Sequence, residues 1–280
     1  MRFGIHIRTA DGLVKALDYA RKLRCQAVQL FSGNPSAWRI KPLDPDAAQE
    51  FAGLTAEWDM RPVVAHTPYL LNLASPDDDI WRKSTDALSE AVRRAQLLGA
   101  SCVVTHIGSH RGSGYQAGVE RICAAVEKAL AVESDVTIAL ELGAGAGNSI
   151  GSRFEHTADI LDCISRGRDR VGICIDTAHL WAAGYDVSTK PGVDAMFESL
   201  EQCVGFDRLK VVHLNDTQKD IGSHADRHYH IGKGQIGLQG FEAVVNRPEL
   251  AGLPGIIETP ADNERADRGN LTVLRKLQKA

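Results

Sequence analysis

The sequence predicts an α/β fold, a single (β/α)8 TIM barrel with its active site at the carboxyl ends of the strands. Three observations support this prediction. Short β-rich runs alternate with amphipathic segments along the whole chain, and a length of 280 residues suits one such barrel. No linker or shift in composition divides the chain. We therefore expect one domain covering residues 1–280.

Eight short apolar runs are the predicted strands. They lie at residues 3–7, 27–31, 63–66, 102–106, 136–141, 171–176, 209–214 and 255–258. A strand followed by a helix, repeated eight times, predicts parallel strands joined by right-handed crossovers. Closing that sheet produces the barrel.

Apolar residues at i, i+3, i+4 spacing predict the helices between the strands. The pattern is clearest at Leu13, Ala16, Leu17 and Ala20, at Leu88, Ala91, Val92 and Ala95, and at Val119, Ile122, Cys123, Val126, Ala129 and Leu130. An open doubly wound sheet is the alternative, but it normally has a glycine-rich phosphate-binding turn after its first strand. Here residues 8–12 read Arg-Thr-Ala-Asp-Gly, which favours the closed barrel.

Composition and charge exclude several classes of protein. Mean hydropathy is −0.18 and no apolar run reaches the roughly 18 residues of a membrane helix, so we expect a soluble, cytoplasmic protein with no membrane partner. With 32 Lys plus Arg against 36 Asp plus Glu, the net charge of −4 lacks the basic excess of a protein that coats nucleic acid. Any polyanionic partner must therefore be bound at a local site, and not by an overall positive charge of the protein. The six cysteines form no CxxC pair and are expected to be mainly buried free thiols.

Ligand-type residues lie at the ends of six consecutive predicted strands, five as the last residue and His213 one residue before the end. They are His66, His106, Glu141, Asp176, His213 and Glu258. One such residue is more often a helix cap or a hydrogen-bonded core residue, but six in one barrel mouth would repel or stay unsatisfied unless a cation organised them. His179 would lie one turn after Asp176, on the same side, if the chain turns helical there.

The connection between residues 215 and 237 is longer than usual for such a fold and adds Asp226 and His228. Imidazole and carboxylate without thiolate are the ligands of hydrolytic zinc or manganese centres. Nine candidates are too many for one four-coordinate ion and fit two or three. Adjacent metal ions suit the cleavage of phosphate esters.

The same stretches resemble endonuclease IV, the zinc-dependent apurinic/apyrimidinic (AP) endonuclease family of base-excision repair. The resemblance runs nearly the whole chain, with family motifs in order and near their usual spacing. It rests on residues 4–6, 66–76, 106–110, 141 with 144–145, 154–156, 174–179, 183–186, 213–216, 226–228 with 232 and 234, and 258–260.

The resemblance implies three zinc ions, with manganese as an alternative at one or more sites. His66 and His106 would hold the first, Asp176, His213 and Glu258 the second, and His179, Asp226 and His228 the third. Glu141 would bridge the first two, between which a hydroxide would attack the phosphate 5′ to an abasic sugar. Glu141, Glu258 and Asp176 are the expected catalytic residues. The products would be a 3′-OH and a 5′-deoxyribose phosphate, and 3′-blocking groups would also be removed.

By the same resemblance the partner is double-stranded DNA with abasic sites or 3′-blocked ends, bound by a monomer. Tyr69 and Leu70 match side chains that enter the DNA stack, and Asn34 and Trp38 match the loop after the second strand. The remaining expected DNA contacts are His6 and His110, which could instead orient metal ligands.

Six positions depart from the family pattern. Arg8 replaces a Ser, Gly33 and Ser36 replace Lys and Arg, and Leu142, Gly143 and Ala146 replace Asn, Thr and Gln. We expect these changes to alter DNA binding and rate while metal binding persists. Two other functions stay open: a two-metal sugar isomerase or epimerase of the same barrel type, and a non-catalytic protein that binds damaged DNA. The third ligand group is the feature that a two-metal isomerase does not require.

Overall fold

In the computed structural model, which describes residues 1–39, 41–260 and 263–279, the strands close into a parallel barrel. Each strand pairs with the next, and β8 pairs with β1. The strands are β1 (Arg2–His6), β2 (Ala27–Phe31), β3 (Val63–His66), β4 (Cys102–His106), β5 (Thr137–Glu141), β6 (Val171–Asp176), β7 (Leu209–His213) and β8 (Pro254–Ile257). The predicted fold is confirmed, and the predicted strand bounds agree to within one residue.

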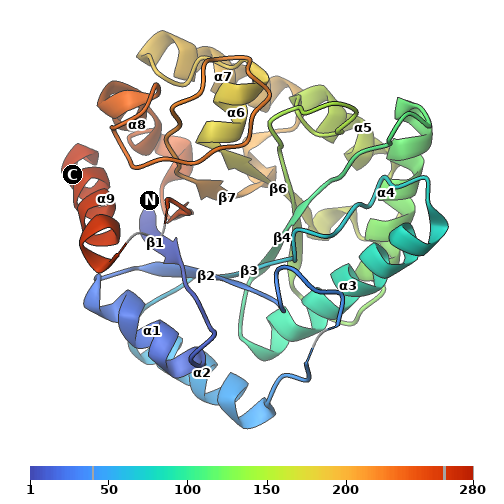
Figure 1. Cartoon of the computed structure of the whole chain (residues 1–280), viewed down its shortest axis with the longest axis horizontal. Helices are drawn as coiled ribbons and strands as arrows, with labels where there is room; N and C mark the ends of the chain where they lie inside the picture. The colour runs from blue at the N-terminus through green and yellow to red at the C-terminus, as the bar shows by residue number, and fades with distance from the viewer. Residues whose placement is uncertain (40, 261–262, 280) are drawn as a thin grey trace.

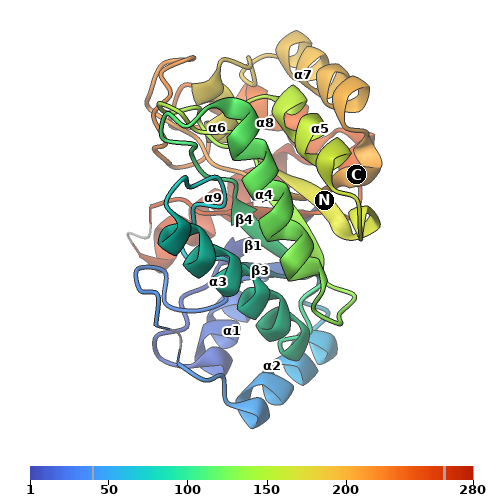
Figure 2. The same ribbon diagram turned by 90° about the vertical axis from the view of Figure 1, so that its right-hand side faces the viewer.

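Helices surround this barrel on its outer side (Figure 1). They are α1 (Leu13–Lys22), α2 (Pro45–Glu57), α3 (Asp78–Leu97), α4 (Tyr115–Leu130), α5 (Phe154–Cys163), α6 (Thr177–Ala183), α7 (Lys190–Cys203), α8 (Gly237–Val245) and α9 (Glu264–Leu277). Single 3₁₀ turns lie at η1 (Arg168–Arg170), η2 (Phe206–Arg208) and η3 (Pro248–Leu250). Figure 2 shows α3 and α4 lying side by side across one flank.

Side-chain caps define where several helices begin. The carboxylate of Asp77 accepts a hydrogen bond from the backbone N–H of Ile80, and Thr189 caps α7 in the same way through Gly192. Asp176 ends β6 and also caps α6, because its Oδ1 accepts from the backbone N–H groups of Ala178 and His179. This cap holds the Asp176 side chain at the barrel mouth.

The barrel interior below the mouth is apolar. Its layer consists of Ala27, Val64, Cys102, Val104, Ala139, Cys174, Val211 and Ile256. Gly4 is required on β1 because a Cβ there would lie 2.0 Å from the carbonyl oxygen of Ala27 on β2. Four of the six cysteines are buried as expected, whereas Cys163 is exposed and Cys203 is partly exposed. The predicted ligand residues lie above this layer, at the carboxyl ends of the strands.

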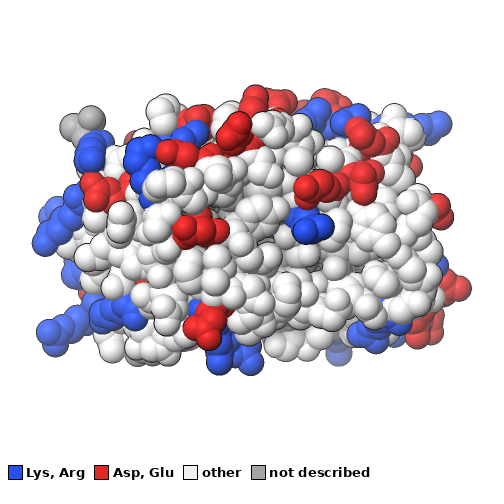
Figure 3. All heavy atoms as spheres, turned by 90° about the horizontal axis from the view of Figure 1, so that it is seen from above, with Lys and Arg blue, Asp and Glu red and all other residues white. Residues whose placement is uncertain are grey.

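The outer surface carries mixed charge. Lys and Arg are interspersed with Asp and Glu on the side drawn in Figure 3, around broad uncharged areas. Within the described residues, no helix combines the length and the apolar composition needed to cross a membrane.

Candidate metal centre

The six predicted strand-end residues meet at the mouth of the barrel. His66, His106, Glu141, Asp176 and His213 are the last residues of β3 to β7, and Glu258 directly follows β8. Because parallel strands all end at the same rim, side chains that are up to 192 positions apart in the sequence become neighbours.

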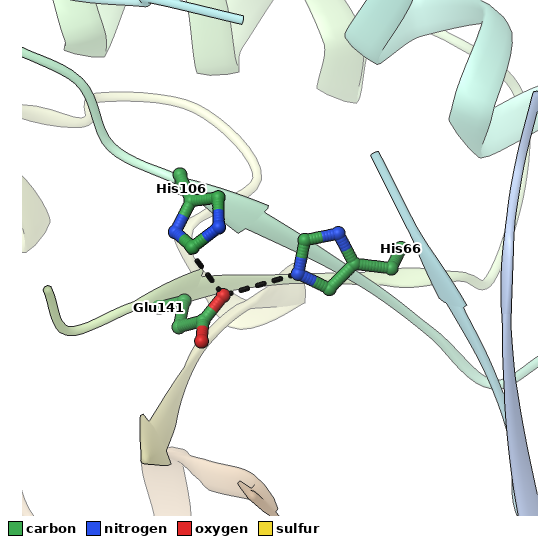
Figure 4. Close-up of side chains that lie close together, drawn as sticks. All are labelled: His66, His106 and Glu141. Atoms are coloured by element: carbon green, nitrogen blue, oxygen red, sulfur yellow. Dashed lines mark hydrogen bonds and ion pairs between the residues drawn. The ribbon is translucent and has the colours of Figure 1, made fainter. Parts of the chain in front are cut away.

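The first group consists of His66, His106 and Glu141 (Figure 4). Oε2 of Glu141 lies 3.1 Å from Nε2 of His66 and 3.3 Å from Nδ1 of His106. The carboxylate is buried, with 1% of its side chain exposed. One oxygen of Glu141 is therefore shared by two imidazole rings.

The other oxygen of Glu141 faces a second group, formed with Asp176, His213 and Glu258. Nδ1 of His213 lies 3.1 Å from Glu141 Oε1 and 3.2 Å from Glu258 Oε2. Asp176 Oδ2 is 3.8 Å from the same nitrogen. The two oxygens of one buried carboxylate thus point into two separate groups of ligand atoms.

A third group combines Asp176 with His179, Asp226 and His228. The short helix α6 places His179 one turn after Asp176, as predicted. Nε2 of His179 lies 3.2 Å from Asp226 Oδ1, and Nε2 of His228 lies 3.4 Å from that oxygen and 3.5 Å from Asp176 Oδ2. All nine candidate ligands therefore gather at one site.

Backbone carbonyls orient three of the imidazole rings. Nδ1 of His66 donates to the carbonyl of the following residue at 2.7 Å, Nδ1 of His179 to that of Leu142 at 2.9 Å, and Nδ1 of His228 to that of Glu258 at 3.2 Å. A carbonyl oxygen only accepts, so each of these Nδ1 atoms carries a hydrogen and directs Nε2 toward the carboxylates. This is the usual arrangement around metal-binding histidines.

The residues fit a bound cation. The buried Nε2 atoms of His179 and His228 make no hydrogen bond although carboxylate oxygens lie within 3.5 Å. Buried polar atoms normally have partners. Two unpartnered imidazole nitrogens that face carboxylates at this spacing match the donor set of a divalent metal ion.

The electrostatics of the cluster favour ionised carboxylates. Burial acts to raise the pKa of Glu141, but the charges of His106 and His213 outweigh it and hold that pKa well below its ordinary value. Burial also opposes the shift at Asp226, where the nearby imidazoles of His179 and His228 lower the pKa to about 2. The carboxylates of Glu141 and Asp226 are therefore ionised at neutral pH, which is the form that binds a metal ion.

Tyr69 stands over this cluster on the loop after β3. The residue is 63% exposed, and its ring centroid lies 6.2 Å from that of His106, with 29° between the ring planes. The backbone N–H of Tyr69 donates to the carbonyl of Pro35, which ties this loop to the one after β2. Leu70 is half-buried beside it.

The other candidate DNA contacts lie on three different segments of the chain. Asn34 and Trp38 are exposed on the loop after β2. His6 ends β1 and places Nδ1 3.1 Å from Glu258 Oε1, so it contacts a candidate ligand. His110 is turned toward its own loop, where its Nδ1 accepts from the backbone N–H groups of Gly112 and Gly114.

Two cavities adjoin at the barrel mouth. The cavity of the ligand cluster, about 320 Å³, is lined by His66, Tyr69, His106, Glu141, His179, Asp226, Arg227, His228 and Glu258. A larger one of about 1670 Å³ shares Tyr69 and Glu258 with it and extends past Arg8, Arg39 and Lys41. Arg8, one of the departures from the family pattern, thus places a positive charge beside the site.

Two further residues contact the candidate ligands although the sequence analysis did not name them as site residues. Gln29, in the middle of β2, is fully buried and contacts both His213 and Glu258. Asn215 follows β7, donates to Asp176 Oδ2 at 2.6 Å and accepts from the backbone N–H of Glu258 at 2.8 Å. A single amide residue within an apolar run, such as Gln29, does not indicate a functional site when the sequence is considered alone.

Comparison with known proteins assigns this arrangement to a family. Residues 17–277 match the family described as xylose isomerase-like TIM barrel. A probable endonuclease 4 of Methanoculleus marisnigri is 45% identical over 276 residues, covering 98% of each chain. The chain belongs to the endonuclease IV family.

Solved structures agree with this assignment. The crystal structure of endonuclease IV from Thermus thermophilus superposes with a TM-score of 0.87 at 34% identity, over 99% of this chain and 98% of that one. A D-tagatose 3-epimerase-like protein superposes with a TM-score of 0.74 at 19% identity, over 99% of this chain and 97% of that one. The latter likeness shows the fold alone. The assignment to the endonuclease IV family is therefore based on the relatives with higher sequence identity.

Proposed function

We propose that the protein is a metal-dependent phosphodiesterase of base-excision repair, which hydrolyses the phosphodiester 5′ to an abasic site in duplex DNA. The products would be a 3′-OH and a 5′-deoxyribose phosphate. The observation that carries the proposal is the Glu141 carboxylate, whose two oxygens face two different groups of ligand atoms while a third group lies beside them. We extend the proposal to the removal of 3′-blocking groups by the same monomer in the cytoplasm.

The donor set assigns each residue a role. His66 and His106 would hold one ion, Asp176, His213 and Glu258 a second, and His179, Asp226 and His228 a third, with Glu141 between the first two. Imidazole and carboxylate donors suit zinc, with manganese as the alternative. Bound ions of this kind supply an activated water near neutral pH and neutralise charge on phosphate oxygens. Glu141, Asp176 and Glu258 act by holding the ions in place.

Residues around the cluster would position the substrate. Arg227 lines the cavity of the cluster and offers a positive charge to a phosphate. Tyr69 presents an exposed ring at the same cavity, where it could replace the stacking that a missing base has lost. The third group, with His179, Asp226 and His228, favours this function over a two-metal sugar epimerase.

Incision of a duplex with one abasic analogue tests the proposal directly. We expect cleavage of the lesion strand on the 5′ side, leaving a 3′-OH that a polymerase extends, and loss of cleavage with a chelator. Elemental analysis should give two to three zinc or manganese ions per chain. A matched duplex without the lesion is the control. Cleavage by metal-free protein, or equal cleavage of both duplexes, would contradict the proposal.

Tyr69→Ala is expected to weaken recognition of the abasic duplex. Loss of one aromatic stacking surface costs roughly 1–3 kcal/mol, which is about a 5- to 150-fold loss in kcat/KM. Tyr69→Phe should retain activity because the ring alone stacks. Metal content should not change in either variant, because the Tyr69 side chain is no candidate ligand. Unaltered kinetics of Tyr69→Ala would remove Tyr69 from the DNA interface.

A further inference from the structure

Gln29 is a polar side chain in an otherwise apolar strand. It lies in the centre of β2, is fully buried, and pairs in register with His6 on β1 and Val64 on β3. Burial of an amide without partners is costly. The positions that Gln29 contacts therefore indicate why an amide, and not an aliphatic side chain, occupies this place.

The orientation of the Gln29 amide follows from Glu258. Nε2 of Gln29 lies 2.7 Å from Glu258 Oε1, and a carboxylate oxygen accepts, so the NH₂ group must face Glu258. The reversed amide would place two acceptor oxygens against each other. Oε1 of Gln29 consequently faces the opposite way, where it lies 2.8 Å from Nε2 of His213.

This orientation determines which nitrogen of His213 is protonated. An amide oxygen only accepts, so Nε2 of His213 must donate to it. Nδ1 is then the nitrogen available to a metal ion, and it is the atom that lies 3.1 Å from Glu141 Oε1 and 3.2 Å from Glu258 Oε2. The same amide thus fixes one ligand from β7 and one from the end of β8.

We infer that Gln29 is a positioning residue, which holds His213 with its hydrogen on Nε2 and so presents Nδ1 to a metal ion shared with Glu258. The inference rests on the proposed metal-dependent function. His66, His179 and His228 are oriented by backbone carbonyls, which no substitution removes. His213 is oriented by a side chain, so its orientation can be tested by mutation.

The decisive measurement is a long-range ¹H–¹⁵N spectrum of zinc-loaded protein labelled with ¹⁵N-histidine. We expect the hydrogen of His213 on Nε2 and none on Nδ1, with the signals assigned by their loss in His213→Gln. The reverse protonation, or zinc bound through Nε2, would overturn the inference. Because the spectrum does not depend on DNA cleavage, its outcome is separate from that of the proposed function.

Gln29→Leu removes the hydrogen bonds to His213 and Glu258, together with the contact between Nε2 and Nδ1 of His6 at 3.0 Å, at similar volume. We expect a 10- to 100-fold loss of zinc affinity at one site in competition with a chelator, the usual effect of removing a residue that orients a ligand. kcat should fall while the KM for the duplex stays unchanged. Wild-type zinc affinity in a folded Gln29→Leu protein would overturn the inference.

Two further variants separate positioning from packing. Gln29→Glu keeps an acceptor for Nε2 of His213 but replaces the donor that faces Glu258, so the protonation pattern of His213 should persist. Ser89→Ala removes another buried side-chain hydrogen bond, the one from its Oγ to the carbonyl of Thr85 in α3, and should leave zinc affinity unchanged. Loss of the Nε2 hydrogen in a folded Gln29→Glu protein would contradict the inference.

Discussion

Replacing Glu141 by Gln is expected to abolish cleavage of an abasic duplex while the barrel stays folded. The carboxylate contacts His66 and His106 through one oxygen and His213 through the other. A neutral amide keeps one oxygen and turns an NH₂ group toward the other side, so both groups lose the negative charge and one of them also loses a ligand atom. We expect kcat/KM to fall by about 10³-fold or more, equivalent to about 4 kcal/mol of barrier.

Steady-state kinetics and metal analysis of the Glu141→Gln protein check this expectation together. The metal content should fall by at least one ion per chain, and circular dichroism should show unchanged secondary structure. Glu127→Gln is the matched control, because Glu127 lies on α4, outside the barrel, where it accepts hydrogen bonds from the backbone N–H and the hydroxyl of Ser165. Wild-type turnover in Glu141→Gln would exclude the bridging role.

Much of the barrel is predictable because its strands are locally distinctive. Apolar runs of four to six residues end in a His, Asp or Glu, and the barrel rule places all such ends on one rim. That rule alone brings His66, His106 and Glu141 together, although 75 residues separate the first from the last. Helix α6 was predictable as well, because Asp176 both ends a strand and caps the turn that carries His179.

Other parts of the site depend on contacts that have no local signal. Gln29 lies inside an apolar run, and its polar role appears only when β2, β7 and β8 meet around it. His6 and His110 look equivalent in the sequence, but strand geometry directs His6 toward Glu258 whereas loop geometry directs His110 toward its own backbone. Tertiary contacts therefore determine which of two similar histidines faces the candidate metal site.

The loop between β7 and α8 illustrates the same limit. It carries Asp226 and His228, and its shape depends on the buried carboxylate of Asp216. That carboxylate accepts hydrogen bonds from the backbone N–H groups of Thr217, Gly234, Ile236 and Gly237. Gly234 is needed for this approach, since a Cβ there would lie 2.2 Å from the carbonyl oxygen of Thr217. One side chain thus joins the two ends of the loop.

Asp216→Ala is therefore expected to remove the third ligand group selectively. Four backbone N–H groups would lose their acceptor, and unsatisfied buried donors cost about 1–3 kcal/mol each, reduced where the loosened loop admits water. We expect the free energy of unfolding to fall by roughly 3 kcal/mol, one metal ion per chain to be lost, and cleavage to fall by about 10²-fold or more. Elemental analysis, urea unfolding and incision kinetics measure these three effects.

Comparing metal content and stability among several variants distinguishes a change in the loop between β7 and α8 from a general loss of stability. Asp216→Asn keeps one acceptor oxygen and should give an intermediate result. Asp186→Ala removes another loop carboxylate, which accepts from Ser188 and Thr189 between α6 and α7, where no candidate ligand lies. It should lower stability without changing metal content. Equal metal loss in Asp186→Ala and Asp216→Ala would show that stability, and not the hydrogen bonds of Asp216, governs the third group.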